Sequence, residues 1–221
     1  LFIALLLFSF TIPLTLYSYL LTIAMSFWVL VALLIISNSH LIRVILSRLS
    51  SFVGICLMYF AWLFLVNIGT NMSGINTGGS ATTFLNNNIQ IRDYLLFLVI
   101  LVSLSDISGY FVGKFMGTRK LCPNISPNKT IQGFIGSIIL PVIFFVIYFL
   151  IYKDYQFILT DLMFLILLCV FCTFGDLFVS CQKRTFDRKD SGNILPGHGG
   201  LLDRLDSYLP CIVLYQYWMF V

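Results

Sequence analysis

The sequence predicts an all-α, polytopic integral membrane protein, and three observations support this class. Of the 221 residues, 59% are hydrophobic and only 10% are charged, whereas an ordinary soluble domain is about 25% charged. The 22 Phe, 11 Tyr and 3 Trp residues carry too much apolar surface for a chain that stays disordered in water. The apolar residues also come in runs long enough to cross a bilayer as helices. A soluble globular protein is therefore excluded.

The apolar runs predict about seven transmembrane helices, because roughly 20 apolar residues cross the hydrocarbon core as a helix. Residues 1–37 are long enough for two crossings, with a break near residues 13–19. The other runs lie at about 50–68, 94–113, 132–152, 157–179 and from 207 to the last residue. The chain does not begin with Met and its last run stops short. We therefore expect that sequence is missing at the N-terminus, the C-terminus or both.

The basic residues predict which loops face the cytoplasm, where Lys and Arg are enriched. Eleven of the 13 Lys and Arg follow the second, fourth and sixth runs: Arg43, Arg48, Lys114, Arg119, Lys120, Lys129, Lys183, Arg184, Arg188, Lys189 and Arg204. This alternation places the loops 114–131 and 182–206 on the cytoplasmic side. The net charge of +4 then belongs to one membrane face, where it attracts anionic headgroups and phosphates and does not indicate nucleic acid.

Two carboxylates lie inside apolar runs, where a charge is costly and is a functional candidate by default. Asp106 is within the fourth predicted span. Its structural alternative is a carboxylate paired with a neighbouring serine on the same helix. Asp176 lies near the cytoplasmic end of the sixth span, and Ser180 follows on the same helix face. There a cation and a phosphate could meet.

The segment 180–207 combines five basic residues, four Asp and His198. A solvated loop could be this charged, but it would not need the run Pro196-Gly-His-Gly-Gly200. Such glycines let the backbone approach a ligand and present N–H groups to an anion. Asp203 and Asp206 should lie on one face where the last helix begins. Carboxylates beside Lys and Arg suit magnesium that holds substrate phosphates.

A second polar stretch, 113–133, is predicted on the same membrane face. It contains Gly113, Gly117 and Gly133 together with Lys114, Arg119, Lys120 and Lys129. A plain positive-inside loop would explain the charge but not the turn at Ser126-Pro-Asn-Lys-Thr130 followed by Gly133 and Gly136. Substrate binding is the favoured interpretation.

Both polar blocks resemble the signature of the phosphatidate cytidylyltransferases, the CDP-diacylglycerol synthases. The residues of the later block are Ser180, Lys183-Arg184, Lys189-Asp190, Pro196, His198-Gly-Gly200 and Asp203-Arg-Leu-Asp206. Those of the earlier block are Asp106, Gly109-Tyr110, Gly113-Lys114, Gly117, Ser126-Pro127, Lys129-Thr130 and Gly133. Gln182 and Ile131 depart from the family, which usually has an apolar residue at the first position and often an aromatic one at the second. The first hundred residues carry no recognisable motif.

The resemblance implies transfer of CMP from CTP to phosphatidate, which gives CDP-diacylglycerol and pyrophosphate in phospholipid biosynthesis and requires Mg²⁺. A second, monovalent cation is compatible with it. The lipid phosphate would attack the α-phosphorus of CTP directly. The partners implied are CTP, phosphatidate, membrane lipids and a second copy in a homodimer, without nucleic acid. The expected location is a bacterial inner membrane with the active site facing the cytoplasm.

The resemblance also assigns roles to residues within one membrane-embedded domain, in which 1–93 form the N-terminal helices and an outward loop and 94–221 the catalytic part. The metal ligands would be Asp176 and Asp203. The catalytic set would be Lys183, Arg184, Lys189, Asp190, His198, Arg204 and Asp206. The substrate-binding set would be Asp106, Lys114, Ser126, Lys129, Thr130, Ser180, Gly199 and Gly200. His198 would either donate to a phosphate or organise its loop, and Ser180 would be a hydrogen-bonding partner.

Three alternatives stay open on the sequence alone. A CTP-dependent nucleotidyltransferase for another lipid phosphate would share the nucleotide and metal residues. An ion-coupled transporter would explain Asp106 and Asp176, but it predicts polar residues through the membrane depth, and here they gather at one face. An inactive copy would not need the intact charged residues.

Overall fold

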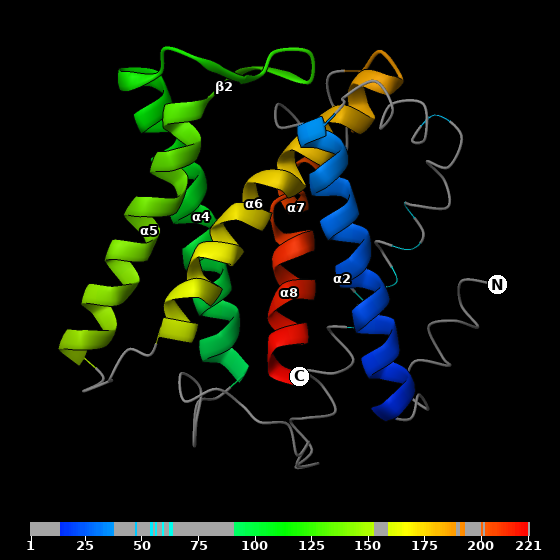
Figure 1. Cartoon of the computed structure of the whole chain (residues 1–221), viewed down its shortest axis with the longest axis vertical. Coiled ribbons are helices and arrows are strands. Elements are labelled where there is room, and N and C mark those ends of the chain that lie inside the picture. Colours follow the sequence, from blue (N-terminus) through cyan, green and yellow to red (C-terminus); the bar gives the residue numbers. More distant parts are fainter. Residues whose placement is uncertain are drawn as a thin grey trace.

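The computed structural model describes residues 14–37, 91–152, 159–188, 191–192, 200 and 202–220, together with residues 47, 54, 56, 59, 62 and 63. Its helices are α2 (Leu14–Ser37), α4 (Ile91–Met116), α5 (Ile131–Tyr152), α6 (Leu159–Thr185), α7 (Leu202–Leu205) and α8 (Tyr208–Phe220). Two strands, β1 (Lys120–Cys122) and β2 (Ser126–Thr130), join α4 to α5. Figure 1 shows the long helices as a bundle with the strands at one end.

Four of the described helices are long and apolar enough to cross a membrane. Their spans are Leu16–Ser37, Leu95–Met116, Ile131–Ile151 and Leu159–Thr185. The membrane class and four of the predicted runs agree with this finding, whereas a total of about seven helices is not confirmed. The predicted break near residues 13–19 is wrong for residues 14–19, because α2 is a continuous helix from Leu14. Residues 1–13 lie outside the described residues, and so does most of the predicted run at 50–68.

The prediction of an all-α chain is incomplete, because the segment between α4 and α5 forms an antiparallel hairpin. Lys120 pairs with Thr130 and Cys122 with Ser126, with an irregularity between the two positions of β1. At the turn, the N–H of Ile125 donates to the carbonyl oxygen of Cys122 at 3.1 Å. The Ile125 side chain is only 1% exposed and belongs to the main apolar core. The hairpin is therefore attached to the bundle at its tip.

The helix ends differ from the predicted loop boundaries. α4 runs to Met116 and α6 to Thr185, so Lys114 and the pair Lys183-Arg184 lie in last helical turns and not in loops. Cations at helix C-termini interact favourably with the helix dipole, which explains why charged residues prolong these helices. The expectation that Asp203 and Asp206 share one helix face is wrong. Asp203 is in α7, whereas Asp206 lies in the turn before α8.

α4 and α5 pack more extensively than any other pair of described elements. Small residues permit this approach, as is common between helices in membranes. A Cβ atom added at Gly133 would lie 2.8 Å from the carbonyl oxygen of Gly109 and 3.1 Å from the Cα of Gly113. The two backbones are therefore in direct contact beside the hairpin.

α6 is the central helix. In the most apolar stretch of α6, 61% of the residues are buried, whereas 28% are buried in the corresponding stretch of each of the other three spans. Trp28 of α2 packs edge-on against Phe178 of α6, with ring centroids 5.5 Å apart. The end of α4, the hairpin, the start of α5 and the end of α6 all lie at one end of the bundle, and α7 lies below them, next to the start of α8 (Figure 1). The described parts of the two polar segments that adjoin these helix ends therefore lie near each other, while their placement on one membrane face stays a prediction.

Candidate functional site

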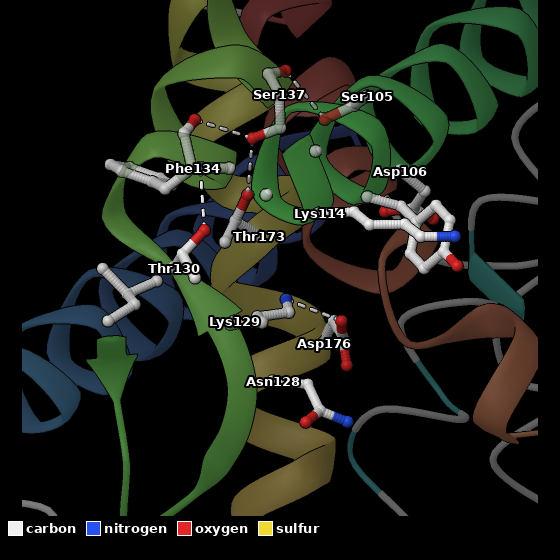
Figure 2. Close-up of a pocket in the computed structure, with 15 residues that line it drawn as sticks. Ser105, Asp106, Lys114, Asn128, Lys129, Thr130, Phe134, Ser137, Thr173 and Asp176 are labelled. Carbon is white, nitrogen blue, oxygen red and sulfur yellow. Dashed lines mark hydrogen bonds and ion pairs between the residues drawn. The ribbon is translucent and has the colours of Figure 1, made fainter. Parts of the chain in front are cut away.

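A cavity of about 380 Å³ lies beneath the hairpin, between α4, α5 and α6. This volume is in the range of small-molecule sites, roughly 300–1,000 Å³. Figure 2 shows side chains from these elements around it. The lining residues are Ser105, Asp106, Gly109, Tyr110, Gly113, Lys114, Leu121, Asn128, Lys129, Thr130, Gly133, Phe134, Ser137, Thr173 and Asp176.

Hydroxyl groups from three helices meet on the apolar side of this cavity. The Ser105 hydroxyl donates to the carbonyl oxygen of Ser137 at 2.9 Å. The Ser137 and Thr173 hydroxyls are 3.3 Å apart, and all three side chains are buried. Since buried polar groups need partners, this network joins α4, α5 and α6 where a lone hydroxyl would be costly.

Lys129 and Asp176 form an ion pair at the cavity. The Lys129 ammonium is 2.6 Å from Asp176 Oδ2, with side chains 26% and 30% exposed. Figure 2 shows the two pointing toward each other, one from the hairpin and one from α6. Asp176 Oδ1 also accepts a hydrogen bond from Ser180 at 3.2 Å, one helical turn later. The hairpin thus places a cation next to a carboxylate of a helix that can span a membrane, nine residues before the end of that helix.

Two further carboxylates interact electrostatically with this pair. Asp106 on α4 accepts hydrogen bonds from the Cys172 thiol, at 3.8 Å, and from Ser207. Asp206 is 9% exposed, and its Oδ1 accepts the N–H of Ser207 at 2.8 Å. Burial raises the pKa of Asp206, and the negative charges of Asp176 and Asp106 add to the rise. Three acidic groups and Lys129 therefore share one region.

Asp203 lies in a separate cluster and is saturated with donors. Its Oδ1 accepts Lys183 Nζ at 2.9 Å. Its Oδ2 accepts the N–H groups of Ser191, at 2.8 Å, and Gly200, at 2.9 Å, and the Ser191 hydroxyl at 2.9 Å. Burial alone would raise the pKa of Asp203, but these hydrogen bonds outweigh it and lower the pKa to about 2. Asp203 thus fastens the segment after α6 to α7.

The carboxylates around the cavity are candidate ligands for a magnesium ion. Within the described residues, no group of three or more His, Cys, Asp or Glu side chains has the geometry of a metal site. Magnesium, however, usually takes one or two carboxylates and completes its shell with substrate phosphates and water. Asp176, with Asp206 or Asp106 beside it, suits that need. Lys129 Nζ already provides a positive charge at the same carboxylate.

The predicted site residues divide into five sets. Those that line the cavity are Asp106, Lys114, Lys129, Thr130 and Asp176, and Ser180 touches Asp176. Asp206 interacts electrostatically with the cavity carboxylates, while Lys183, Asp203 and Gly200 form the second cluster. Ser126 pairs within the hairpin, and Arg184 and Arg204 are exposed away from the cavity lining. Lys189, Asp190, His198 and Gly199 lie outside the described residues.

Several lining residues were not predicted from the sequence: Asn128, Phe134, Ser137 and Thr173. Ser137 and Thr173 could have been found as polar residues within apolar runs, which is the signal that identified Asp106. Asn128 lies next to Lys129 in β2, and only the pairing of the hairpin brings it to the cavity. Phe134 carries no sequence signal, because it is one aromatic residue among many.

The chain is similar to several proteins named phosphatidate cytidylyltransferase. The chain is 46% identical over 119 residues to a phosphatidate cytidylyltransferase of Bacillus subtilis, a match that covers 52% of this chain and 43% of that protein. It is 44% identical over 117 residues to the enzyme of that name from Staphylococcus saprophyticus, and 43% over 116 residues to that from Staphylococcus aureus strain COL, with 52% of this chain and 45% of each relative covered. The matches thus span less than half the length of these relatives.

A family model described as "Cytidylyltransferase family" matches a longer part of the sequence, residues 1–221. This match includes both polar blocks and the helices that carry the cavity. The chain belongs to the cytidylyltransferase family.

Proposed function

We propose that this protein is a phosphatidate cytidylyltransferase, which transfers CMP from CTP to phosphatidate and releases pyrophosphate. The observation that carries the proposal is the Lys129–Asp176 contact of 2.6 Å within a cavity at the ends of membrane-spanning helices. The relatives that bear this name add support.

The reaction requires two anionic substrates to approach each other. Lys114 and Lys129 line the cavity, and their charges would offset the repulsion between the lipid phosphate and the triphosphate. Positioning and charge neutralisation supply most of the catalysis in phosphoryl transfer. The residues of this cavity suit those two tasks.

The bonds that change lie in the substrates. An oxygen of the lipid phosphate attacks the α-phosphorus of CTP, and the bond from that phosphorus to the oxygen of the β-phosphate breaks. Pyrophosphate leaves with the electron pair. No protein nucleophile is needed, and the Ser180 hydroxyl is engaged as a donor to Asp176, which fits a supporting role.

Magnesium, when bound, would supply positive charge to the phosphate oxygens. We propose Asp176 as its first protein ligand, with Asp206 or Asp106 close enough to interact with the same charge. Asp203 is the second ligand implied by the family resemblance. It would have to release some of its four protein donors to serve directly.

The location is proposed on the same grounds. The end of α4, the hairpin and the end of α6, which carry Lys114, Lys129 and Lys183, lie at one end of the bundle (Figure 1), and basic residues favour the cytoplasmic face. CTP is cytosolic and phosphatidate lies in the leaflet, so both substrates could reach a site at this interface. A bacterial inner membrane and a homodimer are parts of the same proposal.

The experiment supplies membranes containing the protein with labelled CTP, phosphatidate and magnesium, beside parallel reactions with other lipid phosphates. Asp176→Asn and Lys129→Met are the test variants. Ile139→Leu, on a half-exposed apolar position of α5, is the control. Magnesium-dependent labelled liponucleotide in the wild type and control, with a loss of at least about a hundredfold in Asp176→Asn, supports the proposal. Product from another lipid phosphate alone would contradict the lipid assignment.

A further inference from the structure

The base of the hairpin is closed by one side chain to which the sequence motifs assign no function. Gln132, in the first turn of α5, accepts hydrogen bonds at Oε1 from the N–H groups of Thr118, at 3.1 Å, and Arg119, at 3.3 Å. Its Nε2 donates to the Thr118 hydroxyl at 2.6 Å. The oxygen and the nitrogen of one side-chain amide thus join the segment before β1 to α5, the helix that follows β2.

Neighbouring contacts make this junction tight. The N–H of Ile131 donates to the carbonyl oxygen of Arg119 at 2.9 Å. The Thr130 hydroxyl accepts the N–H of Gly133 at 3.1 Å and so caps α5. A Cβ atom on Gly117 would lie 2.7 Å from the Thr130 side chain, so α4 turns into the hairpin with no room for a larger residue.

The hairpin is therefore held at two points, with the cavity-lining residues between them. Ile125 fixes the tip in the apolar core, and Gln132 fixes the base. Asn128 and Lys129 lie between these anchors and line the cavity. Lys129 is only three residues from Gln132, so a displacement of the base would move its ammonium relative to Asp176.

We propose that Gln132 is a positioning residue that holds the hairpin, and with it Lys129, over the cavity. The expected effect on reaction rate rests on the proposed function. The position of Lys129, however, can be measured without any substrate. Gln132 lies outside the cavity lining and acts through Lys129.

Two substitutions separate hydrogen bonding from side-chain size. Glu in place of Gln132 still offers an oxygen to both N–H groups, and the Thr118 hydroxyl can donate to it. Met in place of Gln132 keeps the length and apolar stem but accepts neither N–H group. Ile135→Met, at a half-exposed position one turn along α5, controls for adding Met to this helix.

The first readouts need no activity. Hydrogen exchange of peptides that contain Thr118 and Arg119, and acylation of Lys129 by an amine reagent, are measured on the protein in detergent. In Gln132→Met both should be faster, with exchange accelerated about tenfold, whereas Gln132→Glu and Ile135→Met should match the wild type. Unchanged exchange and acylation in Gln132→Met would overturn the proposal.

The second readout is a double-mutant cycle on CMP transfer. Gln132→Met should lower kcat/KM about tenfold when Lys129 is present and cause no further loss in Lys129→Met. An equal loss in both backgrounds would show a general structural role and overturn the positioning role. If the wild type transfers no CMP to any lipid phosphate, the proposed function fails, while the exchange and acylation measurements still decide whether Gln132 holds Lys129.

Discussion

Two aspartates three positions apart have opposite environments. Asp203 is surrounded by four donors from Lys183, Ser191 and Gly200, whereas Asp206 is buried near the charges of Asp106 and Asp176. The family resemblance made Asp203 a metal ligand and Asp206 a catalytic residue, but it could not show which groups surround each carboxylate. The donors that reach each carboxylate depend on how the chain after α6 folds back, and this cannot be deduced from the residue types alone.

The Asp203 contacts predict that Asp203→Asn loosens the segment after α6. The variant lacks the negative charge that pairs with Lys183, and we expect the free energy of unfolding of this segment to fall by about 1–3 kcal/mol. Tryptic cleavage after the exposed Arg188 should become several-fold faster. Asp187→Asn is the control, because Asp187 has a φ of 52° and Asn tolerates that conformation. Equal cleavage rates in the two variants would contradict the role given to Asp203.

The environment of Asp206 predicts a dependence of stability on pH. Its pKa in the folded protein is raised by burial and by Asp176, so above the ordinary value of about 3.9 the folded state holds a proton that the unfolded chain has released. Stability should therefore fall as the pH rises from about 4 toward neutrality. Thermal unfolding in detergent without divalent cations should show this decline in the wild type and a smaller one in Asp206→Asn. Equal slopes would refute the assignment.

At the scale of elements, hydropathy predicted what is local and missed what depends on pairing. The apolar runs at 94–113, 132–152 and 157–179 correspond to α4, α5 and α6, because about 20 apolar residues form a span whatever surrounds them. The hairpin was not predicted, since β1 and β2 are only three and five residues long and are defined by contacts across the turn. The helical extension to Arg184 escaped for a related reason: charged residues end a hydropathy signal without ending a helix.

The contact between α4 and α5 predicts a specific cost for added volume. In Gly133→Ala the new methyl group would meet backbone atoms of Gly109 and Gly113, which cannot rotate away. We expect a loss of about 1–3 kcal/mol in stability, measured as a lower midpoint of thermal unfolding in detergent. Gly54→Ala is matched to it, because no atom lies within 4 Å of its added Cβ. A similar midpoint for both variants would contradict the close packing.

At the scale of the whole molecule, the distribution of charge organises the account. The sequence predicted that basic residues gather on one membrane face, and the structure brings the hairpin and the end of α6 to one end of the bundle (Figure 1). The cavity lies there, between a polar hairpin and helices that can cross a membrane. The sequence could predict this gathering because topology follows from loop charge, but the Lys129–Asp176 contact required the fold.

The most direct measurement of the central claim follows the position of the label in CTP. The protein in vesicles containing phosphatidate and magnesium is given CTP labelled either at the α-phosphate or at the γ-phosphate, beside Lys129→Met. The account predicts that the α-label enters the lipid and the γ-label appears in pyrophosphate, with the lipid signal strongly reduced in Lys129→Met. Transfer of the γ-label to the lipid, or of neither label, would contradict cytidylyl transfer at this site.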